Sequence, residues 1–451
     1  MYSKYRRAAT LTAAVVLVGG ALAGCVPGAS TDAGDVDRTA SAISTDPAEA
    51  GEITLTVWDG ESSSGISTTL DELNAEFEQM YPNVTIERVT RTLDDLKATL
   101  KLAMSGDSPP DVVEANQGYS DMAAYVEAGL LTDLDPYAEV YGWSDRFPES
   151  QLALNSVSDD GSSLGVGSLY GLSLTGEIVG VFANPDVLAK AGLEPATSLE
   201  ELNEQLAGIA AAGITPIAFG NSDTYPAIHL LGAPLAAEYG AEQTADLVFG
   251  RSGSWTDDAV VAAADEIAGW AADGYLSEGF EGQTMDTAVE QFADGDAAYL
   301  IGGIWNQSAM TEMSSVQFSV LPATEGGDLA ALGGIGYPWA IPSKSDNQDV
   351  AAAYINFITS ETGMDTLVEN EQLPAIPSDT AGESMSALGS DILDAWDEIN
   401  AADGLVPYLD WTTPTFYDTI TQNLQLLLAG RIDGEAFGEA LQADYTEFHG
   451  Q

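Results

Sequence analysis

A tryptophan behind a double glycine is the first residue whose type and position point to binding chemistry. The stretch 291–306, QFADGDAAYLIGGIWN, contains the end of an amphipathic helix, a turn at Gly295-Asp296 and a short apolar run at Ala297–Ile301 that predicts a buried strand. The double glycine ends this strand, so Trp305 is expected at the carboxyl edge of a sheet, where open α/β sheets bind ligands. The alternative is a core strand followed by a core tryptophan, and this stretch alone does not decide between them.

The chain holds few of the residues that bind zinc. It has a single cysteine, Cys25, and two histidines, His229 and His449. A zinc site normally requires several Cys or His ligands. We therefore expect no metal, no internal disulfide and no cofactor.

Motifs for catalysis are also weak. Gly161–Gly165, GSSLG, matches the G-x-S-x-G pattern of a hydrolase nucleophile, but its flanks, SVSDD and VGSLYG, are not the apolar strand and the helix that such a nucleophile requires. With 71 Asp and Glu residues, carboxylate pairs arise by chance and do not indicate a glycosidase. We expect a protein that is not an enzyme, and a secreted hydrolase is the less favoured alternative.

Length and charge narrow the class of protein. A chain of 451 residues exceeds what a single core usually organises, so two lobes are expected. The chain has 71 acidic residues and only 13 Lys and Arg, which gives a net charge of −58. Such a surface repels nucleic acid and anionic lipid, so neither is an expected partner.

The N-terminus predicts an exported lipoprotein. Residues 1–24 have a basic start and an apolar core of signal-peptide length, too short for a membrane span. They end in LAGC at 22–25, which resembles a lipobox, in which Cys25 would be lipidated and become the mature N-terminus; an ordinary secretory signal is the alternative. Residues 25–51 are rich in Ser, Thr, Ala, Asp and Gly and predict a flexible linker. We expect an extracytoplasmic protein whose only contact with the cell membrane is the lipid on Cys25.

Strand and helix patterns alternate along the chain and predict an α/β fold. Strands at 53–58, 84–89 and 111–114 are separated by helical patterns at 70–77 and 93–104, an order that implies a parallel sheet. Ser198 and Glu201 fit a capping box at the start of another helix. Further strands are predicted at 178–184, 214–219, 297–301 and 318–321, and further helices at 185–191, 260–270, 350–358, 416–429 and 434–448. Residues 169–174 are expected to form a strand or a crossing segment, and residues 333–341 a Gly-rich segment that leads into another strand.

Several blocks, taken in order, resemble the carbohydrate-type extracellular solute-binding proteins of ABC importers, the group that includes maltose-binding protein. The resemblance covers almost all of residues 53–448. The blocks are ITLTVWDG, LNAEFEQMYPNVTIE, SGDSPPDVVEANQG, LYGLSL, VFANPDVLAKAGL, SLEELNEQLAGIAAAGITPIAF, FADGDAAYLIGGIW, GGIGYPWAIPSKSDNQDVAAAYINFITS, LPAIPS and LLAGRIDGEAFGEAL. Each pattern is loose, and their order behind a lipobox makes the resemblance specific.

The resemblance implies two α/β lobes, joined by crossing strands that act as a hinge, with the ligand in the cleft between them. The first lobe would comprise residues 52–174 and 335–382, and the second lobe residues 175–334 and 383–451. The implied role is to capture a solute and to dock as a monomer on the permease subunits of an ABC importer.

The same resemblance implies a set of ligand-binding residues with aromatic faces or polar side chains, which suit the C–H patches and the hydroxyls of a sugar. Trp305 leads this set. The others are Asp59, Glu61, Asn116, Gln117, Tyr119, Thr175, Glu177, Tyr225, His229, Tyr337, Trp339, Trp411, Phe416 and Tyr417.

Alternatives remain open for several members of this set and for the ligand itself. Asp59 could cap the turn that follows it, His229 could be a core histidine, and a single member of the Tyr337–Trp339 pair could face the ligand. The acidic residues would also suit a cationic solute such as a polyamine, and aromatic residues also bind peptides. The aromatic residues and the carbohydrate-type blocks favour a sugar or oligosaccharide.

Overall fold

The computed structural model describes residues 40–450 except 62–63, 311–312 and 379–384. The predicted signal peptide, Cys25 and the first part of the predicted linker lie outside these residues. In the described part, no helix combines the length and the apolar character that a membrane crossing requires.

The first sheet contains the strand–helix–strand pattern of the N-terminal part. Its order is β2 (Val84–Thr90), β1 (Ile53–Asp59), β3 (Val112–Glu114), β12 (Pro338–Ala340) and β6 (Leu172–Ser173). The pairs β1–β2 and β1–β3 are parallel, as predicted, and β12 is antiparallel to both of its neighbours. Every second side chain of β1, those of Leu55, Val57 and Asp59, is buried, because successive side chains of a strand point to opposite faces.

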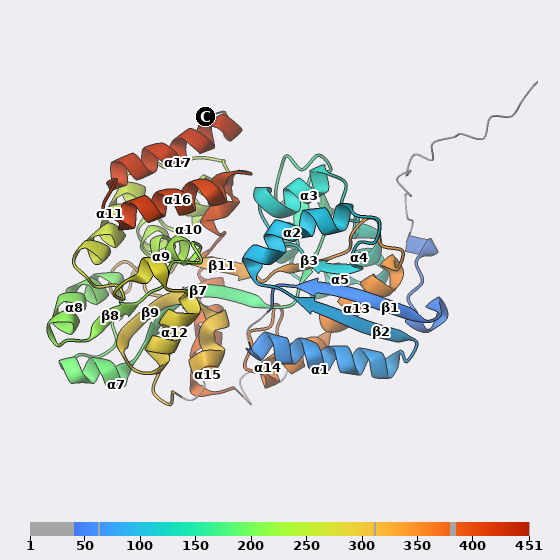
Figure 1. Cartoon of the computed structure of the whole chain (residues 1–451), viewed down its shortest axis with the longest axis horizontal. Coiled ribbons are helices and arrows are strands. Elements are labelled where there is room, and N and C mark those ends of the chain that lie inside the picture. The colour runs from blue at the N-terminus through green and yellow to red at the C-terminus, as the bar shows by residue number, and fades with distance from the viewer. Residues whose placement is uncertain (1–39, 62–63, 311–312, 379–384, 451) are drawn as a thin grey trace, which may run out of the picture. The chain divides into compact units, whose positions relative to one another are not determined.

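Helices from two separate stretches of the sequence cover this sheet (Figure 1). They are α1 (Ser64–Met80), α2 (Leu93–Ser105), α3 (Ala124–Glu127), α4 (Asp135–Tyr141), α5 (Trp143–Arg146), α6 (Glu149–Leu154), α13 (Gln348–Ile358) and α14 (Glu361–Glu369). Short helical turns lie at Ala40–Ala42, Pro47–Ala50 and Tyr119–Ala123, and a small hairpin joins β4 (Ser156–Val157) to β5 (Ser168–Leu169). We call this sheet with its helices the first lobe.

The second sheet has the order β13 (Leu405–Val406), β11 (Ala331–Ile335), β7 (Gly176–Ala183), β9 (Ala297–Gly303) and β8 (Thr215–Ala218), with β10 (Gln317–Ser319) paired to β7. Its helices are α7 (Pro185–Leu188), α8 (Leu199–Ala211), α9 (Pro226–Tyr239), α10 (Ala241–Val248), α11 (Asp258–Ala272), α12 (Met285–Ala293), α15 (Ala387–Ala401), α16 (Phe416–Leu428) and α17 (Gly434–His449). Short turns lie at Ala189–Ala191, Phe280–Gly282, Ile304–Met310 and Leu409–Thr412. This sheet with its helices is the second lobe.

Strand β9 is the apolar run that precedes Trp305. All of its residues are buried, because β7 and β8 flank it and apolar clusters cover both of its faces. A strand that is covered on both faces reads as a continuous apolar run, as this one does. The turn before it contains Gly295 at φ +79°, as the Gly-Asp pair predicted.

Three segments pass between the lobes side by side. The first joins β6 to β7 at Leu174–Thr175, the second joins β11 to β12 at Gly336–Tyr337, and the third is the chain around Pro374. The Gly336 N–H donates to the Thr175 carbonyl at 2.8 Å, and the Ala375 N–H donates to the Leu174 carbonyl at 3.0 Å. A Cβ at Gly336 would lie 2.1 Å from Thr175 Oγ1, so this close approach requires a glycine.

Two local predictions differ in detail from the structure. Residues 169–174, expected as a strand or a crossing segment, contain parts of two short strands, β5 and β6, which Tyr170-Gly171 separates, and they lead into the first crossing. At α8 the Ser198 hydroxyl accepts from the Glu201 N–H as a cap, but the Glu201 carboxylate accepts from the Thr197 N–H rather than from that of Ser198. The capping box is therefore only half formed.

Candidate functional site

A small cavity of about 20 Å³ lies where the first lobe meets the second, beside the crossing segments. The first lobe contributes Glu61, just after β1, and the second lobe contributes Glu177 on β7 and Trp305 after β9. The remaining lining residues are Ile66, Thr175, Gly176, Ile304, Gln307, Gln372 and Leu373. Four of the predicted ligand-binding residues, Glu61, Thr175, Glu177 and Trp305, thus line one cavity.

The indole of Trp305 lies directly over the backbone of Gly303. A Cβ at Gly303 would lie 2.0 Å from Trp305 Cη2, so the second glycine of the pair makes room for the ring. The ring centroid of His229 lies 5.4 Å from that of Trp305, and the Tyr225 side chain lies close to Trp305. These contacts hold the tryptophan at the cavity while leaving it only partly buried.

The predicted residues Tyr225 and His229 form an aromatic layer behind Trp305. Their ring centroids are 5.4 Å apart, and His229 also lies 5.7 Å from Tyr408. Burial lowers the pKa of His229 to about 3, so its imidazole is neutral at physiological pH. His229 therefore supports Trp305 as an uncharged ring.

Three carboxyl groups gather around Tyr337. Burial, and then the neighbouring Glu177 and Asp59, raise the pKa of Glu61 to about 8. Burial and Glu61 raise the pKa of Glu114 well above its usual range, and burial raises that of Glu177 to about 7. The Tyr408 hydroxyl donates to Glu177 at 2.9 Å and the Gly60 N–H donates to Glu114 at 2.7 Å. The region can therefore offer both protonated and ionised carboxyl groups to a ligand.

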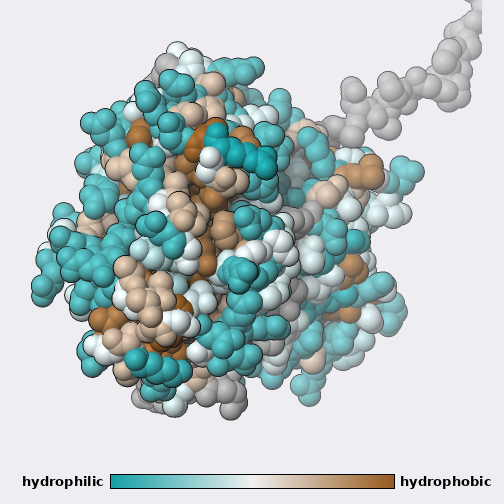
Figure 2. Space-filling view, turned by 60° about the vertical axis from the view of Figure 1, so that its left-hand side comes forward, coloured by the Kyte–Doolittle hydropathy of each residue, from teal (hydrophilic) through white to brown (hydrophobic). Residues whose placement is uncertain are grey.

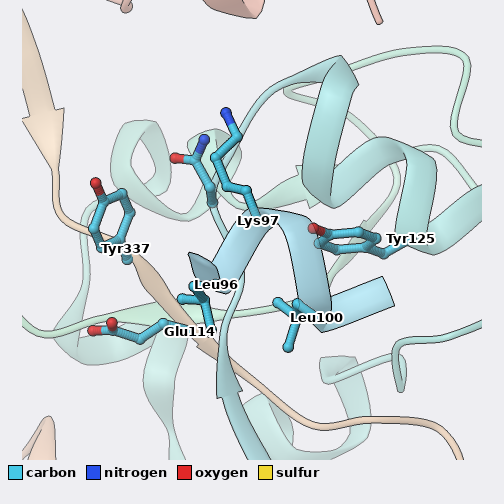
Figure 3. Close-up of a pocket in the computed structure, with 7 residues that line it drawn as sticks. Leu96, Lys97, Leu100, Glu114, Tyr125 and Tyr337 are labelled. Atoms are coloured by element: carbon cyan, nitrogen blue, oxygen red, sulfur yellow. The ribbon is translucent and has the colours of Figure 1, made fainter. Parts of the chain in front are cut away.

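A second cavity, of about 10 Å³, lies on the first-lobe side of this carboxyl group cluster. It is lined by Leu96, Lys97, Leu100, Glu114, Asn116, Tyr125 and Tyr337 (Figure 3). The predicted residues Asn116 and Tyr337 belong to this lining, and the Asn116 amide donates to Asp121 at 2.9 Å. Tyr337 and Glu114 line this second cavity, and Glu61 and Glu177 line the first. Besides burial, the charges of Glu61 and Glu177 raise the pKa of Tyr337, and that of Glu61 raises the pKa of Glu114, so the two cavities are neighbours.

Asp59 and Gln117 are bonded to other parts of the protein. Asp59 is fully buried, and Arg88 donates to both of its oxygens at 2.8 and 2.9 Å. Asp59 also accepts from the Glu61 N–H at 3.1 Å, which is the turn-capping alternative. The Gln117 amide donates to the carbonyls of Ile335 and Gly336 at 3.2 and 3.0 Å and so attaches β3 to a crossing segment.

The predicted residues Tyr119, Trp411 and Tyr417 lie at contacts between the lobes. Tyr119 packs against Phe448 with ring centroids 4.9 Å apart. The Trp411 ring is buried beside Gly118, whose φ is +90°, and Lys97 Nζ lies 3.9 Å from the centre of the Tyr417 ring.

Trp339 and Phe416 lie in the cores, away from both cavities. Trp339 is 1% exposed and meets Tyr354 edge to face, so Tyr337 is the member of its pair that reaches the site. Phe416 is fully buried against Trp255, with ring centroids 4.8 Å apart. We do not retain either residue as a ligand contact.

Sequence reasoning overlooked Glu114, Tyr408, Gln307, Gln372 and Lys97. Glu114 is the last residue of β3, two residues before the predicted Asn116, and its position at a strand end was the available signal. Lys97 follows Leu96 on α2, and a lysine is a rare residue in this acidic chain.

The raised carboxyl pKa values predict how stability depends on pH. A carboxyl group whose pKa is about 7 when folded and 4.5 when unfolded stabilises the fold most below pH 4.5, and this contribution is lost as the pH rises through 7. We expect Glu177→Gln to flatten the fall in unfolding free energy between pH 5 and 8, measured by urea denaturation. Glu204→Gln, on the exposed side of α8, is the matched control and should follow the parent. Equal pH profiles for parent and Glu177→Gln would contradict the buried position of Glu177.

The two sheets, the three crossing segments and the cavities between the lobes define a two-lobe α/β binding protein of the periplasmic-binding-protein type, as predicted. Residues 61–365 match the model of the bacterial extracellular solute-binding protein family, and the chain belongs to that family. An uncharacterized ABC transporter extracellular-binding protein of Pyrococcus horikoshii is 21% identical over 379 residues, which cover 81% of this chain and 79% of that protein.

Solved structures share the fold. One, from a study of xylan utilization by Caldanaerobius polysaccharolyticus, is similar with a TM-score of 0.76, 23% identity and coverage of 87% of this chain and 99% of the other. A chitin oligosaccharide binding protein has a TM-score of 0.75, 24% identity and coverage of 89% and 100%. The solute receptor AcbH, described as having an exclusive preference for β-D-galactopyranose, has a TM-score of 0.75, 18% identity and coverage of 88% and 100%.

Proposed function

We propose that this protein captures a sugar or oligosaccharide between its lobes and delivers it to the permease of an ABC importer. The observation that carries the proposal is a single cavity lined by the Trp305 ring and by the carboxyl groups of Glu61 and Glu177. An indole face suits the C–H patches of a pyranose ring. Carboxylates accept strong hydrogen bonds from neighbouring hydroxyl groups.

Relatives support the choice of a sugar. The similar structures include proteins described with xylan, with chitin oligosaccharides and with galactose, and the Pyrococcus relative is described as an ABC transporter component. The family is defined by solute binding. The proposed function is accordingly binding and delivery, with no catalytic step.

A cationic solute is a second candidate. Glu61, Glu114 and Glu177 lie close together, while Arg88 is paired with Asp59 and Asp71, and Lys97 is paired with Asp121. A polyamine or a basic peptide would compensate these carboxylates. The aromatic layer behind Trp305 favours a sugar over such a ligand.

The proposal includes an extracytoplasmic location and a lipid anchor at Cys25. It also includes lobe segments at 52–174 with 335–382 and at 175–334 with 383–451, and a monomeric state. The surface seen in Figure 2 is mostly hydrophilic, and an acidic chain is repelled by anionic lipid headgroups. A lipid is therefore the proposed means of attachment, and mass spectrometry of the mature N-terminus tests it: an unmodified Cys25 would contradict it.

A thermal-shift screen tests the proposed ligand class. A ligand present at 100 times its Kd adds about 2.7 kcal/mol to the unfolding free energy. We expect the protein to melt at a higher temperature with one or a few glycans from a panel of xylo-, chito- and galacto-oligosaccharides and their monosaccharides. Spermidine, a basic peptide and buffer alone form the comparison set. If spermidine or the peptide raised the melting temperature and no glycan did, the site would be one for a cationic solute instead of a sugar.

A further inference from the structure

We propose that Lys97 is a latch between the lobes, whose ammonium group stabilises the closed arrangement by binding the Tyr417 ring across the cleft, in the field of the Asp410 carboxyl group. The proposal rests on the two-lobe fold and is independent of which solute binds.

The geometry places one cation between groups of both lobes. Lys97 extends from α2 in the first lobe, and its Nζ lies 3.1 Å from Asp121 Oδ2 of the same lobe. The same Nζ lies 3.9 Å from the centre of the Tyr417 ring, at the start of α16 in the second lobe. The Lys97 side chain is only 17% exposed, so the contact excludes most water from the ammonium group.

The first-lobe side of the latch is held in place before the lobes meet. Asp121 accepts hydrogen bonds from Asn116 at 2.9 Å, from Ser120 at 3.2 Å and from the Tyr125 hydroxyl at 3.1 Å. Its carboxylate therefore has a fixed position on the turn that follows β3. Lys97 and Asn116 both line the second cavity, so the latch adjoins the candidate site (Figure 3).

The second-lobe side is also preset. The Tyr417 hydroxyl lies 3.3 Å from Thr224 Oγ1, and this hydrogen bond holds the ring against the segment before α9. Asp410, in the turn Leu409–Thr412, is 9% exposed, and its charge acts on Lys97. A cation over a tyrosine face contributes about 0.5–2 kcal/mol, with the larger values when water is excluded.

The balance of costs and gains favours the charged lysine in this arrangement. Burial lowers the pKa of Lys97, and the attraction of Asp121 and Asp410 more than offsets it, so the pKa is raised above its usual value. Tyr417 and Asp410 belong to the second lobe and move away from Lys97 when the lobes separate. Protonated Lys97 therefore binds its surroundings more strongly when the lobes are closed.

Two neighbouring contacts between the lobes carry no charge. A Cβ at Gly118 would lie 2.9 Å from Trp411 Cδ1, and Tyr119 packs against Phe448. These contacts provide shape and apolar area next to the latch. Because all members of the latch are protein groups, its effect should be measurable without solute.

The test measures the distance between the lobes in solution. The full chain carries Cys25→Ser and two spin-labelled cysteines, Thr85→Cys on β2 and Glu204→Cys on α8, both at exposed positions. Double electron–electron resonance without solute should show a population at the distance of the closed structure. We expect Lys97→Met to lower this population at least threefold. Lys101→Met, one turn further along α2 and exposed, should leave it unchanged.

Independent variants make the test decisive. Tyr417→Leu should lower the closed population as Lys97→Met does, and the double variant should lose no more than either single one. If Lys97→Met does not fold, Tyr417→Leu alone tests the proposal. Thermal melting followed by circular dichroism shows whether each variant is folded. The proposal is overturned if the parent has no closed population without solute, or if Lys97→Met and Tyr417→Leu keep the parental distribution. Neither outcome bears on the proposed sugar, because no solute is present.

Discussion

Trp305→Ala is expected to weaken ligand binding at least tenfold, about 1.4 kcal/mol, while the protein remains folded. The indole is the large apolar face of the first cavity, and alanine would leave the C–H patches of a sugar without a stacking partner. The ring is only partly buried, so its removal costs less stability than the loss of a core tryptophan. Isothermal titration calorimetry with a glycan found by the thermal screen measures the change.

Trp305→Phe is the matched variant, because it keeps a smaller aromatic face over Gly303. Its affinity should fall between those of the parent and Trp305→Ala. Unchanged affinity in Trp305→Ala, with intact circular dichroism, would return Trp305 to a packing role beside His229.

Arg88→Met is expected to lower the free energy of unfolding by about 3–5 kcal/mol, the usual result of removing one partner of a buried ion pair. Arg88 donates to both oxygens of Asp59, which has no exposed surface, and to Asp71 and the Glu61 carbonyl. Methionine would leave the Asp59 charge uncompensated at the end of β1. Urea denaturation measures the loss.

Arg431→Met is the control for this substitution, since Arg431 is exposed after α16 and such changes usually stay within about 0.5 kcal/mol. Equal stabilities of Arg88→Met and Arg431→Met would show that Asp59 does not depend on Arg88. Asp59 would then regain its place among the residues available to the ligand.

Much of the fold could be predicted because its determinants are local. The alternation in Ile53–Trp58, the Ser198 cap and the Gly295 turn each depend on residues close in sequence, and the structure confirms them. The two-residue strands β13 and β6 depend instead on distant partners, β11 and β12. A strand of that length has no periodicity to detect, so β13 was not predicted and β6 was merged with β5.

The sequence predicted where the site lies better than it predicted which residues belong to it. The resemblance located Trp305, Glu61 and Glu177 on separate segments, and the structure brings them to one cavity. It could not tell which face of β12 is inward, so Trp339 was included although it lies in the core. Glu114 was overlooked because no single acid stands out among 71, and only the fold shows that its strand ends beside Glu61.

A crystal structure of the mature protein with a glycan that raises its melting temperature is the decisive test of the proposed site. We expect a sugar ring against the Trp305 indole, with hydroxyl groups within hydrogen-bonding distance of Glu61 and Glu177, one from each lobe. A glycan bound outside the two cavities, or one that contacts a single lobe and leaves Trp305 uncovered, would contradict it.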